Sequence, residues 1–146
     1  YREPKIGRIR NILFDNLVVT GPGRVFMEGM PGRPIEDVRF RDVLWNVTGR
    51  CRTEGIQKPP GARRVEIDPD RINYAVHPYQ FIAAHVDGLT LLDIRIKPGR
   101  EGYVPDRGQL YAERVERLAV ERVEAFASPE GIPPVRFPAS AAAERA

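Results

Sequence analysis

The sequence predicts an all-β protein, and more closely the C-terminal coils of a right-handed parallel β-helix. Three observations lead to this prediction. An apolar template recurs four times, turn-forming residues interrupt it at fixed places, and a short apolar segment precedes each copy after the first. Apolar residues two positions apart lie on one face of a strand, whereas a helix would need spacings of three and four throughout.

The template places apolar residues at the first, fourth, sixth, ninth and eleventh positions of a segment. The four copies are Ile9, Ile12, Phe14, Leu17, Val19; Ile35, Val38, Phe40, Val43, Trp45; Val86, Leu89, Leu91, Ile94, Ile96; and Val115, Leu118, Val120, Val123, Ala125. They begin at residues 9, 35, 86 and 115, so the chain advances by about one short solenoid repeat each time, with one interval of double length.

Residue pairs that can turn a chain separate the strand-like halves of each copy. These are Arg10-Asn11, Glu36-Asp37, Asp87-Gly88, Glu116-Arg117, and then Asp15-Asn16, Arg41-Asp42, Leu92-Asp93, Glu121-Arg122. Asn, Asp and Gly tolerate the left-handed backbone that a tight corner between extended segments requires. We expect further short strands at residues 25–27, 81–83 and 110–112, and one last edge strand at 134–137. Three strands per coil describe a parallel β-helix.

Leucine-rich repeats are the alternative, because they share the first, fourth, sixth and eleventh apolar positions. They carry Asn or Cys at the ninth position. Here that position holds Leu17, Val43, Ile94 and Val123, which favours the β-helix.

The expected organisation is one domain, with coils over residues 1–138 and a long loop excursion at about 49–79. Residues 139–146 carry no strand pattern and are expected to be disordered or a short helical tail. Because the sequence opens at Tyr1 directly before a repeat, we expect a piece of a longer protein. In the excursion, Arg50, Arg52, Arg63 and Arg64 either bind carboxylates of a polyuronate or form a solvated loop.

Composition excludes several classes. The chain of 146 residues has 23 Lys and Arg against 20 Asp and Glu, a net charge of +3 that is too small to indicate nucleic-acid binding. Cys51 is the single cysteine and there are two histidines, so we expect no disulfide, no metal site and no cofactor. No apolar run approaches the roughly 20 residues that span a bilayer, so no membrane association is expected.

Candidate acid and base residues occur at the corners. Asp42 and Asp93 occupy equivalent positions, with Asn16 in the same register. Inverting glycoside hydrolysis needs two carboxyl groups roughly 6.5–9.5 Å apart, which neighbouring coils could supply. The alternative is a ladder of corner residues that bonds turn backbone, and Asp15 and Asp37 are interpreted as turn residues of this kind.

Histidine and aromatic residues provide further candidates. His85 is either a proton shuttle or a residue at a sheet edge, and His77 precedes the return to the strands. Tyr74, Tyr79 and Tyr103 either present rings to sugars or cover the edges of the core. At an inward template position, Trp45 is expected in the core. The triplet Asn46-Val47-Thr48 fits an N-glycosylation acceptor.

Three runs, residues 9–17, 27–40 and 78–91, resemble the C-terminal coils of the polygalacturonase-like glycoside hydrolases, family 28. The resemblance covers roughly residues 6–127 and includes the link Gly-Met-Pro-Gly-x-Pro-Ile at residues 29–35. It implies a pectin-degrading β-helix that cleaves galacturonan-type chains by inversion. The family's catalytic motifs are missing here, so no catalytic residue is assigned, and such residues are expected upstream of Tyr1. Arg95-Ile96-Lys97 matches a family substrate-binding motif in letters but follows the third copy, where Ile96 is an inward position.

The functional prediction is therefore the C-terminal fragment of a pectin- or galacturonan-degrading hydrolase, inactive by itself. Its partners would be an acidic plant-type polysaccharide and the rest of the same β-helix upstream, and the resemblance implies a secreted or periplasmic location. Substrate-binding residues are not identified. One alternative is a non-catalytic β-helix for carbohydrate binding or adhesion. A polysaccharide lyase would need a calcium site, and no acidic cluster in the sequence indicates one.

Overall fold

The computed structural model describes residues 7–49, 72, 77–126, 128–138 and 144–145. These residues form an all-β structure in which every pair of named strands is parallel, and they contain no helix. Accordingly, no helix capable of crossing a membrane is found among them. Most of the predicted excursion lies outside the described residues, including Cys51, Tyr74 and the candidates Arg50, Arg52, Arg63 and Arg64.

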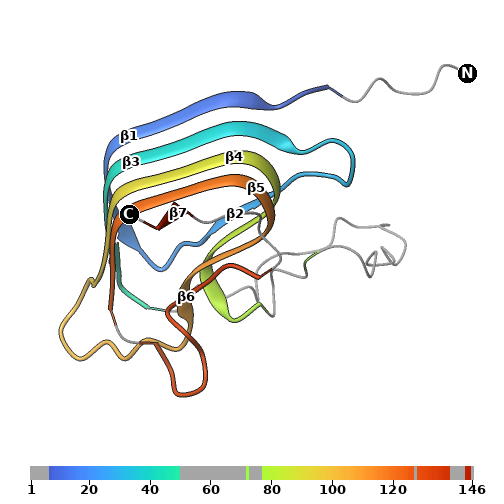
Figure 1. The fold of residues 1–146 in the computed structure, drawn as a ribbon. Helices are drawn as coiled ribbons and strands as arrows, with labels where there is room; N and C mark the ends of the chain where they lie inside the picture. Colours follow the sequence, from blue (N-terminus) through green and yellow to red (C-terminus); the bar gives the residue numbers. More distant parts are fainter. Residues whose placement is uncertain (1–6, 50–71, 73–76, 127, 139–143, 146) are drawn as a thin grey trace, which may run out of the picture.

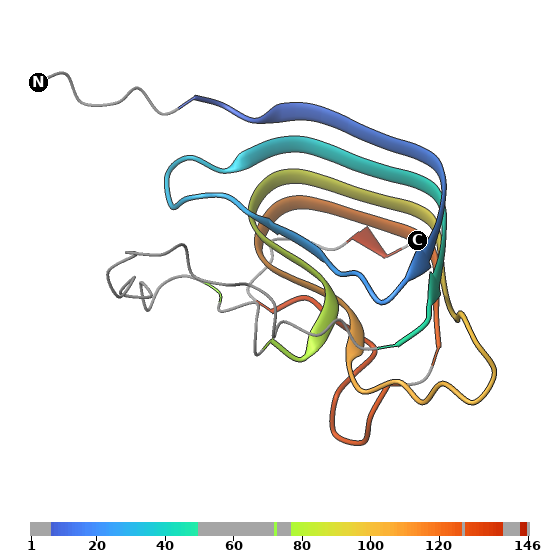
Figure 2. The same cartoon turned by 180° about the vertical axis from the view of Figure 1, so that it is seen from behind.

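In the described part of the chain, seven strands make up one sheet. They are β1 (Arg10–Gly21), β2 (Val25–Glu28), β3 (Ile35–Val47), β4 (Tyr79–Pro98), β5 (Gly108–Ala125), β6 (Val135–Arg136) and β7 (Glu144–Arg145). The order is β1-β3-β4-β5-β6, with β2 beside β4 and β7 beside β5. The four long strands run side by side and bend together, which is seen from both directions in Figures 1 and 2.

The register of the long strands aligns the four apolar templates position by position. Ile12 lies beside Val38, which lies beside Leu89 and then Leu118. The other template rows pair in the same way, as in Phe14, Phe40, Leu91, Val120 and in Val19, Trp45, Ile96, Ala125. Because side chains alternate across a strand, each row sends its apolar residues to the same face. The predicted strand pattern is confirmed at these positions.

The second residue of every predicted turn pair has left-handed backbone geometry. These residues are Asn11, Asn16, Asp37, Asp42, Gly88, Asp93, Arg117 and Arg122, with φ between 51° and 87°. Strand pairing skips each of these residues and resumes at the next one, so each long strand bends there without ending. Two further residues, His85 and Arg114, have φ of 50° and 51° and were not predicted as corners.

The core is centred on β3, β4 and β5. In β4, the residues Tyr79, Phe81 and Ala83 are buried on one face, and Gln80, Ile82 and Ala84 on the other. A parallel strand buried on both faces reads as a nearly continuous apolar run, as this one does. Trp45 is also buried, which confirms its predicted place in the core.

Within the described residues, the short strands agree with the sequence in four places and differ in one. β2, the first part of β4, the first part of β5, and β6 occupy the segments predicted as short strands. The exception is β7, which pairs with Ala119 and Val120 in a tail where no strand was predicted. Backbone pairing with the edge of β5 explains it, because a ladder needs only N–H and C=O groups and no apolar pattern. The remaining tail residues lie outside the described part.

Candidate functional site

Arginines of one strand reach aspartates of an earlier strand at the corners. Arg41 donates to both carboxylate oxygens of Asp15, at 3.0 Å from Nε and 2.6 Å from Nη2. Arg122 pairs in the same forked way with Asp93. Bonding to Arg41 lowers the pKa of Asp15, and bonding to Arg122 lowers that of Asp93. Fork-shaped arginine pairs of this kind hold the carboxylates ionised and oriented.

Asp42 and Asp93 have two interpretations, and the ion pair of Asp93 with Arg122 helps to distinguish them. Both residues lie in one row of the sheet, between the paired residues Arg41 and Leu92 and the paired residues Val43 and Ile94. A general acid needs a raised pKa, and the pKa of Asp93 is lowered instead. Asp93 therefore acts as a corner residue that links β4 to β5, which favours the corner ladder.

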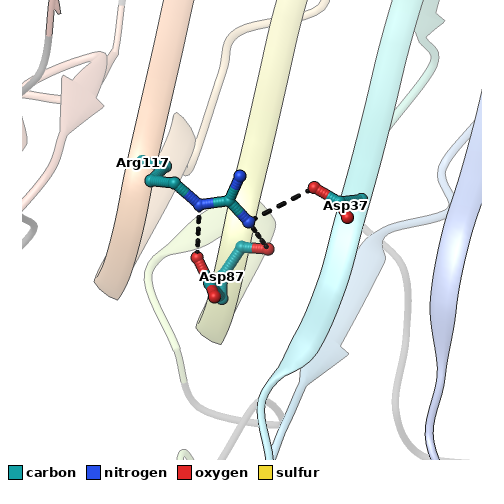
Figure 3. Close-up of polar contacts among 3 residues, drawn as sticks. All are labelled: Asp37, Asp87 and Arg117. Carbon is teal, nitrogen blue, oxygen red and sulfur yellow. Dashed lines mark hydrogen bonds and ion pairs between the residues drawn. The ribbon is translucent and has the colours of Figure 1, made fainter.

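A second ion cluster spans β3, β4 and β5 at the first corner (Figure 3). Arg117 Nε donates to Asp87 Oδ1 at 2.7 Å, and Arg117 Nη2 approaches both Asp37 Oδ1 and the Asp87 carbonyl oxygen at 3.3 Å. Gly88 makes this crossing possible. A Cβ at that position would lie 2.8 Å from Asp37 Oδ1 and 3.0 Å from Arg117 Nη2. The predicted turn role of Asp37 therefore includes a contact to a strand two places away.

Beside this cluster lies a surface depression of about 370 Å³. Its lining combines apolar and charged groups, mainly Met30, Pro34, His85, Asp87, Arg114 and Glu116. We call it the corner depression. An apolar wall with a few polar groups around it is typical of sites for small polar ligands.

One wall of the corner depression is the tight turn at residues 29–34. Met30 N–H donates to the Arg33 carbonyl oxygen at 3.1 Å, and Arg33 N–H returns a bond to Met30 at 2.9 Å. Gly32 has a φ of 74°, as Gly does after Pro in a type II turn. Gly29 binds the Ala84 carbonyl oxygen at 2.9 Å, and its missing side chain leaves room for the His85 carbonyl oxygen, 2.2 Å from a Cβ there. The turn is thereby held against β4.

The floor of the corner depression contains His85 on β4 and Arg114 on β5. The two residues occupy equivalent positions, between the paired residues Ala84 and Glu113 and the paired residues Val86 and Val115. Arg114 Nη1 lies 3.4 Å from His85 Nε2. Among the described residues, no ion pair joins Arg114 to a carboxylate, in contrast to Arg117 and Arg122 on the same strand. His85 thus stands opposite Arg114 as Asp93 stands opposite Arg122.

The aromatic candidates serve the core edge. Tyr79 is buried, and its hydroxyl donates to the Pro133 carbonyl oxygen at 2.8 Å. Tyr103 is half-buried, and its ring meets that of Phe126 at 6.1 Å. His77 packs edge-on against Tyr111 at 4.5 Å, and its pKa is lowered, chiefly by burial. For Tyr79 and Tyr103 these contacts favour the core-edge interpretation over sugar contact.

The remaining candidates lie apart from the corner depression. Ile96 is buried as predicted, whereas Arg95 and Lys97 are exposed on β4. Asn46 Nδ2 donates to Thr20 Oγ1 at 3.2 Å on the exposed face. In the described part of the chain, no group of three metal-ligating side chains lies close enough to hold an ion.

Comparison with known proteins identifies no relative of this chain. No family model, curated protein sequence or solved structure matches the chain. What the arrangement can do is therefore argued from its own chemistry. Asp15, Asp87 and Asp93 are held by arginines at the corners. The corner depression brings an apolar wall, the imidazole of His85, the guanidinium of Arg114 and the carboxylate of Glu116 around one space.

Sequence reasoning missed two parts of this site. The corner at His85 and Arg114 falls just before the first template position and uses residue types that seldom take left-handed geometry. No turn was predicted at residues 29–34, which served only as evidence for the family resemblance. The Pro-Gly pair in this segment is nevertheless a turn signal by itself. Predicting the cross-strand ion pairs requires the strand register, that is, which residues of neighbouring strands lie side by side. In the sequence, only the alignment of the apolar templates indicates that register.

Proposed function

We propose that the long strands are coils of a right-handed parallel β-helix, and that the chain is the C-terminal part of a hydrolase that degrades pectin- or galacturonan-type polysaccharides. The main support is the in-register stacking of four apolar templates whose corners share left-handed backbone positions. Stacked coils of this kind bury one continuous core across neighbouring repeats. The substrate class comes from the resemblance of three sequence runs to family 28.

The open face beside β1 supports the proposed partner, the rest of the same β-helix upstream. Within the described residues, β1 pairs on one side only, with β3. The first, third and last residues of the template that includes β1, which are Ile9, Phe14 and Val19, are 55%, 38% and 40% exposed, whereas Phe40 and Trp45, the β3 partners of Phe14 and Val19, are 7% and 5% exposed. An apolar hollow of about 290 Å³, lined by residues such as Phe14, Trp45 and Phe81, also lies at this end. One more coil with the same template would cover these groups and pair the edge.

In this proposal the chain does not itself cleave the polysaccharide. The corner aspartates Asp15 and Asp93 are held as ion pairs with lowered pKa values, so they are poor proton donors. The chain would extend the stacked core and contribute the corner depression to a carbohydrate groove. A secreted or periplasmic location goes with this proposal.

The test is an activity and binding measurement on the 146-residue chain with polygalacturonate. We expect no release of reducing ends, together with retardation of the chain in affinity electrophoresis through a polygalacturonate gel. A dextran gel of the same concentration is the control and should not retard it. Release of reducing ends above a heat-inactivated control would overturn the claim that catalysis lies elsewhere, and equal mobility in both gels would contradict the substrate class.

A non-catalytic module for carbohydrate adhesion is the second candidate, and the arginine-bound corner carboxylates favour it. The reading frame upstream of Tyr1 discriminates the two. Repeats that carry a pair of aspartates on one face support the hydrolase. Repeats with the same apolar template but no such pair support the adhesion module.

A further inference from the structure

The corner depression contains a guanidinium, that of Arg114, which forms no ion pair with a carboxylate of the described residues. Three cross-strand arginines, Arg41, Arg117 and Arg122, each meet a carboxylate of an earlier strand. Arg114 occupies the same kind of place and meets the imidazole of His85 instead. A neutral imidazole accepts one hydrogen bond and cancels no charge. The guanidinium of Arg114 therefore keeps both its charge and most of its donors for another group.

The residues around Arg114 limit the kind of ligand that its guanidinium could bind. Arg114 and Glu116 are exposed, and the depression beside them has a volume of about 370 Å³. Met30 and Pro34 supply apolar surface on which the C–H face of a sugar ring can rest. Asp87 is already bound by Arg117, whereas Glu116 remains as an acceptor for hydroxyl groups.

We propose that the corner depression is a binding site for a sugar acid, whose carboxylate is bound by Arg114 beside His85 and whose ring lies against the wall formed by residues 29–34. This proposal rests on the proposed function and names a subsite for it. A guanidinium recognises a carboxylate through two parallel N–H bonds, which a neutral sugar cannot reproduce. The wall is fixed before the ligand arrives, because Gly29 and the Met30–Arg33 bonds hold it against β4.

The decisive experiment replaces His85 in two ways and measures binding of trigalacturonate by calorimetry. His85→Asp introduces a carboxylate opposite Arg114 and copies the Asp93–Arg122 pair, so we expect at least a tenfold loss of affinity. His85→Asn keeps Arg114 unpaired and should retain affinity within about threefold. Both residues suit left-handed backbone, as Asn16 and Asp42 do, so circular dichroism should show both variants folded.

Arginine variants give the matched control. Arg114→Gln should also lose at least tenfold, because a charge-assisted bond is replaced by a neutral one. Arg39→Gln removes the same charge from an exposed position on β3 outside the depression, and should leave affinity unchanged. Equal effects of the two arginine variants would overturn the site, since they would indicate only a general attraction to positive charge.

Two further ligands separate this proposal from the proposed function. Methyl-esterified trigalacturonate should bind at least tenfold more weakly than the free acid. If both bind equally and Arg114→Gln changes neither, the sugar-acid site is wrong while carbohydrate binding stands. If neither binds, the proposed function fails as well. Inorganic phosphate that binds as tightly as trigalacturonate would also overturn the assignment, by identifying a general anion site.

Discussion

β4 and β1 carry the same apolar template and the same corner geometry, yet they differ in burial. The template residues of β4 are all buried, whereas those of β1 are exposed or half-buried. The difference follows from their neighbours, since β4 lies between β3 and β5, and β1 pairs only with β3 among the described strands. The template therefore predicts the face of the sheet on which a side chain lies. Whether that side chain is buried depends on the neighbouring strands that stack on it.

The largest expected effect compares one row of the sheet at these two strands. Leu89→Ala in β4 should lower the free energy of unfolding by about 2–5 kcal/mol, because it removes a fully buried side chain and leaves a cavity. Ile12→Ala, in the same row of β1, should cost about 1 kcal/mol, because its side chain is half-buried. Urea denaturation followed by far-UV circular dichroism measures both. Equal losses would contradict the account of β1 as an open edge.

A smaller loss of stability is expected at the left-handed corner positions, which occur in β1 as they do in β4. Asn16→Val in β1 should lose about 1–2 kcal/mol, since a β-branched residue is strained at a φ of 53°. Asn46→Val in β3 makes the same exchange in extended backbone and forfeits only an exposed hydrogen bond to Thr20. It should change stability by less than about 0.5 kcal/mol. Comparable losses in both variants would show that the left-handed corner is not the cause.

The smallest expected effect concerns pH, at the residue that leads into β4. Burial, helped by the charge of Arg24, lowers the pKa of His77 below its usual value near 6.5. The unfolded chain then binds a proton before the folded chain does, so the stability that His77 contributes is present above pH 6.5 and is lost as pH falls through the lowered pKa. The melting temperature should decline from pH 7 toward pH 5, and less steeply in His77→Gln. Parallel declines in the two proteins would refute this assignment.

The corners show how far the fold could be predicted from the sequence. The residue types of Asn11, Asn16 and Gly88 predict left-handed backbone, because this geometry costs Asn and Gly little free energy. Arg117 and Arg122 do not, and they were placed only because the template aligned them with Asp37 or Asp93. Residue chemistry and repeat spacing together therefore predicted most of the bends.

The candidate site was less predictable, because its parts belong to no single repeat. Contact between Arg114 and His85 depends on a corner that lies before the template begins. The Arg117 cluster reaches from β5 to β3, so it requires the exact stacking of three strands and a missing side chain at Gly88. The short strand β7 was not predicted either. It pairs with β5 through backbone groups, and such pairing requires no apolar pattern that could be recognised in the sequence.

Trp45, the chain's one tryptophan, gives the hollow beside β1 an optical consequence. Its indole lines that hollow, and its Nε1 atom is buried without a hydrogen-bond partner among the described residues. Tryptophan fluorescence, excited at a wavelength that tyrosine does not absorb, therefore originates at the very end where another coil would stack. Emission wavelength and quenching by iodide would report, without any label, the moment at which that end becomes covered.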